Sequence, residues 1–223
     1  MSSKGYAMVC AMVLCSLGLF GCPPTRPARV AQGVNTASDI RKAELLRQLD
    51  KKWENPVTHY ELGQLYHAEG DWSKADWYYD QAIGFNPAYR DAQAAKVKMQ
   101  LDKGDKSKSE YLASMFMTQV VSAPEQLMLL GEAFEKQGLD SYALKCYRDA
   151  LKAQPDSYKI NRQLAYYYLH KNDNEQAKEY FIRSFNMNSN QPDVANELGK
   201  LGVAVRSPEP GTSPSKLGQP IRP

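Results

Sequence analysis

A fixed spacing of residue types constrains this chain more than any other feature. From Pro56 to Leu201 the same types of residue return every 34 residues or a multiple of 34, with no insertion or deletion. Leucine followed by a small residue fills one pair of columns, alanine a second column and an aromatic ring a third. Examples are Leu62-Gly63, Leu130-Gly131, Leu164-Ala165 and Leu198-Gly199; Ala75, Ala143 and Ala177; and Tyr79, Tyr147 and Phe181. Such a period predicts an array of equal units that bury their apolar faces against their neighbours.

The expected turns keep the same period. Residues suited to the left-handed conformation that ends a helix lie between two helical patterns in each unit. They are Gly70, Gly104, Gly138 and Asn172. Pro56, Pro124 and Pro192 stand where a helix begins, a position at which the missing N–H has no effect. Each unit is therefore predicted to be a helix, a tight turn and an antiparallel helix.

These columns resemble the tetratricopeptide repeat, whose pattern has Leu-Gly, Tyr, Ala, a bulky aromatic residue, Ala and Pro at set places over 34 residues. The resemblance covers about two-thirds of the chain. It implies an all-α fold, a right-handed α-solenoid of about four helix-turn-helix units with a capping helix at each end. The predicted segments are 38–55 for the N-terminal capping helix, 56–89, 90–123, 124–157 and 158–191 for the repeats, and 192–202 for the C-terminal capping helix.

The second unit departs from the pattern. Lys96 and Gln100 stand where leucine and an aromatic residue are expected, and Ala113 and Phe116 reverse the usual order of small and large. A local repacking that conserves volume is one interpretation. The alternative is a structural role in which the chain forms homo-oligomers through this unit, with Met115 or Met117 exposed as the contact.

The first 22 residues have the pattern of an export signal. Lys4 precedes an apolar run of about 15 residues, too short to span a bilayer comfortably as a helix, and we expect residues 1–21 to be a signal peptide. Leu19-Phe20-Gly21-Cys22 is similar to the bacterial lipobox, in which the cysteine is acylated and becomes the new N-terminus. The alternative is an ordinary signal peptide with a chance cysteine at its end.

Segments with proline and no periodicity flank the repeats. Residues 22–37 are expected to form the lipidated cysteine and a flexible tether, and residues 203–223 a disordered tail. The tail is either a frayed terminus or a short motif for a partner. Pro23 is not the aspartate associated with inner-membrane retention in enteric bacteria, so the expected location is the periplasmic side of the bacterial envelope, with the outer membrane favoured over the inner.

No pattern in the chain points to catalysis or to a cofactor. A Gly-rich phosphate loop, HExxH, GxSxG and paired Cys/His metal spacing are all missing from the sequence. After signal cleavage only two cysteines remain, Cys22 and Cys146. Cys146 is interpreted as a small buried hydrophobic residue, with a reactive thiol as the alternative. The formal net charge of +3 gives no electrostatic reason to expect nucleic acid as a partner. We therefore predict no enzyme activity, no cofactor and no metal.

The resemblance places the binding surface on the first helices, which line the concave side in this class of repeat. Aromatic and thioether groups beside amides and charges suit a bound peptide segment, whereas the alternative is an ordinary solvated face. The matching positions hold Tyr60 and Gln64 where clamps for chaperone tails carry lysine and asparagine, so that use is not expected. The predicted groove residues are Tyr60, Gln64, His67, Lys98, Met128, Glu132, Arg162, Tyr166 and His170.

Together these observations lead to one functional hypothesis. We expect a lipid-anchored, non-catalytic scaffold that binds a protein or peptide segment of an envelope protein and aids assembly of a pilus, secretion or outer-membrane complex. A protein that organises cell-wall enzymes is a further alternative with the same layout.

Overall fold

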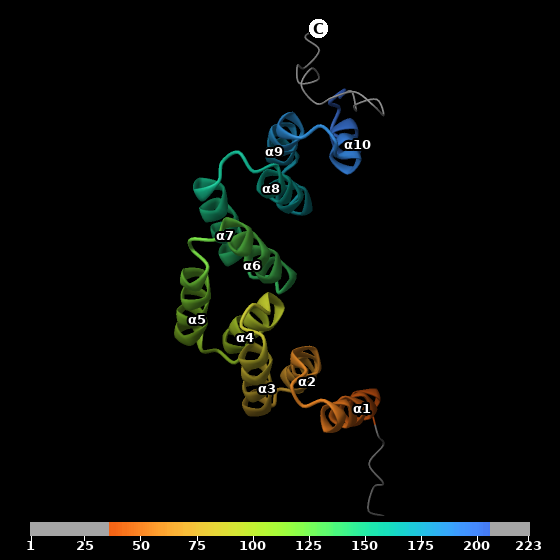
Figure 1. The fold of residues 1–223 in the computed structure, drawn as a ribbon, viewed down its shortest axis with the longest axis vertical. Helices are drawn as coiled ribbons and strands as arrows, with labels where there is room; N and C mark the ends of the chain where they lie inside the picture. Colours follow the sequence, from red (N-terminus) through yellow and green to blue (C-terminus); the bar gives the residue numbers. More distant parts are fainter. Residues whose placement is uncertain (1–35, 206–223) are drawn as a thin grey trace, which may run out of the picture. The chain divides into compact units, whose positions relative to one another are not determined.

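The computed structural model describes residues 36–205, and that part of the chain is all α-helical (Figure 1). It contains ten helices and no strand. They are α1 (Ala37–Lys51), α2 (Pro56–Ala68), α3 (Trp72–Phe85), α4 (Arg90–Asp102), α5 (Lys106–Gln119), α6 (Pro124–Lys136), α7 (Asp140–Ala153), α8 (Tyr158–His170), α9 (Asn174–Met187) and α10 (Pro192–Lys200). The predicted signal peptide, Cys22, most of the tether and most of the tail lie outside the described residues. None of the helices described is long and apolar enough to cross a membrane.

The helices form a repeat solenoid in which α2–α3, α4–α5, α6–α7 and α8–α9 are the four hairpins. Each hairpin packs against the next, and the first helices α2, α4, α6 and α8 also contact one another in sequence. The first helix of each unit therefore has neighbours on both its own hairpin and the adjacent ones. This arrangement gives the solenoid one face built from first helices only.

Turn chemistry explains the fixed period. Gly70, Gly104, Gly138 and Asn172 all have positive φ, as the sequence predicts for this column. At the first turn the N–H of Asp71 donates to the Tyr66 carbonyl at 2.9 Å, which satisfies one of the last carbonyls of α2. The Asp71 side chain then accepts from the Lys74 N–H at 3.2 Å and caps α3.

Small residues set the distance between the two helices of a hairpin. A Cβ placed on Gly63 would lie 2.6 Å from two ring carbons of Tyr79, and one on Gly131 would lie 2.6 Å from Tyr147. Both tyrosines are fully buried. The aromatic column therefore packs directly over the small-residue column of its own repeat.

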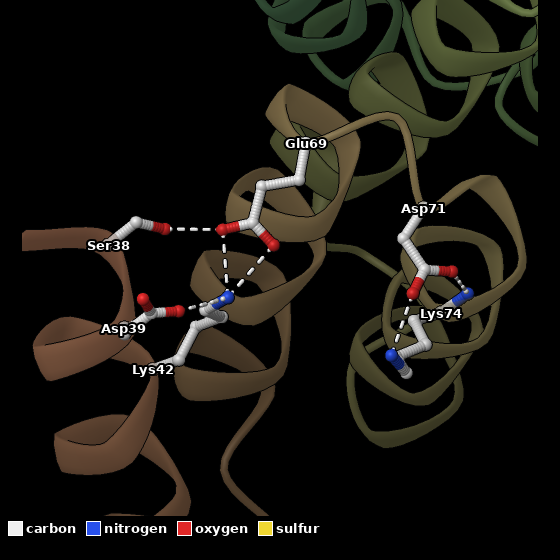
Figure 2. A network of polar contacts seen from close by, with 6 residues as sticks. All are labelled: Ser38, Asp39, Lys42, Glu69, Asp71 and Lys74. Carbon is white, nitrogen blue, oxygen red and sulfur yellow. Dashed lines mark hydrogen bonds and ion pairs between the residues drawn. The ribbon is translucent and has the colours of Figure 1, made fainter. Parts of the chain in front are cut away.

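Helix α1 covers the open side of the first repeat (Figure 2). Ser38 donates to Glu69 at 2.6 Å, and Lys42 Nζ lies 2.8 Å from Glu69 and 3.0 Å from Asp39. These hydrogen bonds raise the pKa of Lys42 above its ordinary value. Leu45 and Leu49 are buried against Leu62 and Tyr78. Polar contacts at one end and apolar packing along the rest thus close this side of the array.

The N-terminal helix is shorter than the predicted segment 38–55. It ends at Lys51, and Trp53 and Glu54 form a turn before Asn55, which caps α2 by accepting from the N–H groups of Val57 and Thr58. The turn brings the Trp53 carbonyl within 2.8 Å of His59 Nε2. This contact and the asparagine cap explain why the chain leaves the helix before residue 55.

The irregular second unit contains a buried lysine held by ion pairs, and its methionines are not exposed. Lys96 is only 6% exposed, and its ammonium lies 3.0 Å from Asp76 and also pairs with Asp80, both on α3. Met117 is buried and Met115 is partly buried. The hypothesis of an oligomer contact through these two methionines therefore loses its observational basis.

Candidate functional site

Two adjoining surface pockets lie along the first helix of the first repeat. One has a volume of about 380 Å³ and is lined by residues of α1 and α2 together with Tyr89. The other has a volume of about 350 Å³ and is lined by residues of α2, α3 and α4 together with Gln137, which follows α6. Gln64 lines both pockets and is itself exposed. The two pockets therefore meet at this amide.

Aromatic rings form much of the first pocket. Tyr60 packs edge-on against Tyr89 with 5.2 Å between ring centroids, and its hydroxyl accepts from Gln64 Nε2 at 2.9 Å. Burial raises the pKa of Tyr60, and it raises the pKa of Tyr89 to about 12. Both phenols are therefore neutral hydrogen-bonding groups at physiological pH. Arg41 and Glu61 supply charge beside them.

A polar network organises the second pocket. His67 Nε2 lies 3.1 Å from Asp102 Oδ2, and its Nδ1 lies 3.3 Å from the hydroxyl of Tyr79. Lys98 also pairs with Asp102. Asp102 thus joins α2 to α4, and it holds the imidazole of His67 at the wall of the pocket, next to Trp72 with 5.7 Å between ring centroids.

The structure brings the predicted groove residues together in separate groups. Tyr60, Gln64, His67 and Lys98 gather around the two pockets. His170 lies away from them and pairs with Glu135 at 2.9 Å.

Toward the C-terminal end, Arg162 and Tyr166 both contact the same carboxylate, Asp193 of α10. The distances are 3.7 Å from Arg162 Nη1 and 3.0 Å from the hydroxyl of Tyr166. Their polar groups therefore meet α10, and Tyr166 also packs edge-on against Phe181.

Two further predicted groove residues are involved in packing. Met128 packs partly buried against the main apolar cluster. Glu132 is half-buried, and burial raises the pKa of its carboxyl group. These two side chains contribute less free surface than the sequence pattern predicted.

Several residues at the pockets were missed from the sequence. Asp102 stands among alternating charges, a pattern typical of a solvated turn, but it is the carboxylate that His67 and Lys98 share. Trp72 is the first residue of α3, and Tyr89 lies in the linker before α4, so neither residue belongs to a first helix. The spacing of 35 residues between His67 and Asp102, one more than the repeat, is the signal that could have identified the pair.

The chemistry of this surface is that of recognition. Neutral phenols, two amides, an imidazole paired with a carboxylate, and indole and phenol rings offer donors, acceptors and apolar area together. Within residues 36–205 there is no cluster of three or more His, Cys, Asp or Glu side chains arranged to hold a metal ion. Cys146 is fully buried, and burial raises the pKa of its thiol to about 12, so it stays protonated and unreactive at neutral pH.

Comparison with known proteins gives matches by family and by structure. The family model described as Tetratricopeptide repeat matches residues 57–89 and 159–191. A search of curated proteins by sequence gave no match.

Three solved structures illustrate the structural likeness. MamA from Desulfovibrio magneticus RS-1 is 16% identical, with 70% of this chain and 89% of that chain covered and a TM-score of 0.36. The pilF protein of Pseudomonas aeruginosa is 22% identical, with coverages of 72% and 68% and a TM-score of 0.37. YrrB, described as a TPR protein with an unusual peptide-binding site, is 12% identical, with coverages of 70% and 81% and a TM-score of 0.37.

Proposed function

We propose that this chain, a tetratricopeptide repeat protein, is a non-catalytic scaffold of the bacterial envelope. In this proposal it binds an extended segment of another envelope protein and so aids assembly of a pilus, secretion or outer-membrane complex. The repeat fold by itself suggests a protein-interaction scaffold.

The observation that carries this proposal is the pair of pockets that meet at Gln64. An extended peptide presents alternating N–H and C=O groups, so it needs donors and acceptors along one line. The amides of Gln64 and Gln137 supply both kinds of group, and the phenol of Tyr60 is held by Gln64 itself. Rings of Tyr60, Tyr89 and Trp72 offer apolar area with little side-chain entropy to lose.

The binding surface is held in place before a ligand arrives. Asp102 fixes both His67 and Lys98, and Tyr79 is buried behind the imidazole. Because these side chains already share partners, binding would freeze few additional rotamers. A prearranged surface of this kind favours binding of a short peptide segment whose backbone N–H and C=O groups are not already hydrogen-bonded within the segment.

A substitution at the junction of the pockets tests the binding surface. Gln64→Arg would place a long cation where the pockets meet, and Gln119→Arg, at an exposed position of α5, is the matched control. Affinity capture from detergent-solubilised native membranes is expected to recover one envelope protein with the native chain and the control, and to lose it with Gln64→Arg. Equal recovery with all three chains would place binding elsewhere.

Membrane attachment is the second part of the proposal. Gly21-Cys22 after an apolar run supports acylation of Cys22, and Pro23 supports the outer membrane as the destination. Metabolic labelling with radioactive palmitate is expected to mark the native chain and to leave Cys22→Ser unlabelled. Labelling of both chains, or of neither, would refute acylation at Cys22, and sedimentation with inner-membrane markers would refute the outer membrane as the location.

A further inference from the structure

A patch of large aromatic side chains stands exposed around one buried histidine. Trp53 is 50% exposed, Trp77 is 45% exposed and Phe85 is 38% exposed. Their ring centroids lie 5.0, 6.2 and 5.3 Å from that of His59, which is fully buried. Trp53 comes from the turn before α2, whereas Trp77 and Phe85 come from α3. We call Trp53, Trp77 and Phe85 the aromatic patch.

Packing within the first repeat buries only part of the surface of these side chains. Trp53 and Trp77 contact each other at 6.1 Å, and Trp77 packs edge-on against Tyr78 at 4.8 Å. About half of each indole still faces solvent, although Trp and Phe bury more apolar area than almost any other side chain. A grouped exposure of this kind marks a surface that contacts something apolar.

We propose that the aromatic patch inserts into the lipid–water interface of the membrane that the anchor at Cys22 holds nearby. This inference rests on the proposed acylation of Cys22. Indole rings with an apolar body and one N–H group concentrate at the level of the lipid headgroups. Lys51 and Lys52 are exposed and directly precede Trp53, but the exposed carboxylates of Asp50 and Glu54 flank them, so the rings and not the net charge carry the expected contact.

The length of chain before the structure permits this contact. Cys22 and Thr36 are 14 residues apart, and an extended chain of that length reaches roughly 45 Å. Helix α1 has 15 residues and so extends about 22 Å from its start to Lys51, two residues before Trp53. The reach of the tether therefore exceeds the distance along α1, and the patch can meet the same bilayer that holds the lipid.

Membrane contact through the aromatic patch leaves the pockets free. The patch meets α2 at His59, whereas the pockets meet it at Tyr60 and Gln64. Consecutive helical residues point about 100° apart, and no residue of the patch lines either pocket. The first repeat could then contact lipid and a protein segment at once, with the membrane fixing how the first helices face the partner.

Tryptophan fluorescence offers a site-specific test because the chain has three tryptophans: Trp53, Trp72 and Trp77. Full-length chains that keep one tryptophan, with phenylalanine at the other two positions, are reconstituted into vesicles of phosphatidylcholine and phosphatidylglycerol. Matched vesicles carry bromine, a quencher, on the acyl chains. Circular dichroism checks that each variant keeps its helices, and the native chain with all three tryptophans is measured alongside.

Brominated lipid is expected to quench Trp53 and Trp77 and to leave Trp72, which lines a pocket, nearly unchanged. The native chain should then lose an intermediate fraction of its fluorescence. Equal quenching at all three positions would overturn the inference. So would blue-shifted but unquenched emission from Trp53 and Trp77, which would show that another part of the chain or a second copy covers the patch.

A Cys22→Ser chain in the same vesicles separates this inference from the proposed anchor. If Trp53 and Trp77 are still quenched in the Cys22→Ser chain, and the native chain is not acylated, the result would support the patch and refute the anchor. Confirmed acylation without quenching would refute the patch alone.

Discussion

Individual residues set the geometry of each hairpin, and Gly63 shows how sharply. Its missing side chain leaves room for the ring of Tyr79, which lies where a Cβ would come within 2.6 Å. Overpacking of this kind costs about 1–3 kcal/mol, more than the gain of up to about 1 kcal/mol from the better helix propensity of alanine. The balance therefore favours glycine here, although glycine is otherwise a poor helix residue.

Gly63→Ala is accordingly expected to lower the free energy of unfolding, measured as a lower urea midpoint by circular dichroism. Gly84→Ala is the matched control, because nothing lies within 4 Å of a Cβ at that helical position. The control should be neutral or slightly more stable. A Gly63→Ala chain as stable as the native protein would show that Tyr79 can move aside.

His59 gives a prediction about pH at the same scale. Burial lowers its pKa below the ordinary value of about 6.5, and the contact with the Trp53 carbonyl opposes this only in part. The unfolded chain therefore binds a proton at His59 more readily than the folded chain. The stabilising contribution is present above pH ~6.5 and is lost as the pH falls from there through the lowered pKa.

His59→Asn should accordingly weaken the fall of the urea midpoint between neutral and mildly acidic pH, whatever its effect on stability at neutral pH. Titrating carboxylates act equally in both chains, so the difference in slope isolates the histidine. The same slope in both proteins would contradict this assignment.

Elements join through paired side chains that recur across the array. His67–Asp102 connects α2 to α4, and His170–Glu135 connects α8 to α6, each pair 35 residues apart. In the first pair the acid lies on the later repeat, whereas in the second it lies on the earlier one. In each pair, a buried tyrosine contacts the residue that lies on the same hairpin: Tyr79 contacts His67, and Tyr147 contacts Glu135.

Glu135→Ala is expected to destabilise the chain by about 1–3 kcal/mol, because the buried hydroxyl of Tyr147 would lose the acceptor it donates to at 2.8 Å. The exposed pair between Glu125 and Lys159 provides the control, since removing an exposed ion pair has little effect. Glu125→Ala should leave the urea midpoint unchanged. Equal effects of the two substitutions would mean that the hydrogen bond to Tyr147 contributes little.

The period in the sequence was sufficient to predict helices, turns and hairpins, because those depend on residue types at fixed local spacing. Contacts between repeats were harder. Lys96 looked like a break in the pattern because its partners Asp76 and Asp80 lie on another hairpin, at spacings unrelated to the repeat. Asp102 was missed because its partner His67 also lies on another hairpin, although their spacing of 35 residues is close to the repeat. The aromatic patch was missed because Trp53 lies in a turn that follows no column.

At the scale of the whole molecule, separate surfaces have separate chemistry. The first-helix pockets offer amides, phenols and a fixed imidazole, and the aromatic patch offers exposed rings beside two lysines. We assign the partner protein to the first surface and lipid to the second. The central claim is that a segment of another envelope protein lies across Gln64.

Site-specific photocrosslinking in living cells tests that claim most directly. A photoreactive phenylalanine derivative is placed at position 64 in one chain and at position 119 in another, and both are illuminated at equal expression. We expect one discrete adduct with an envelope protein from position 64 and none from position 119. Absence of an adduct at position 64 from a folded, membrane-associated chain, or the same adduct from both positions, would contradict it.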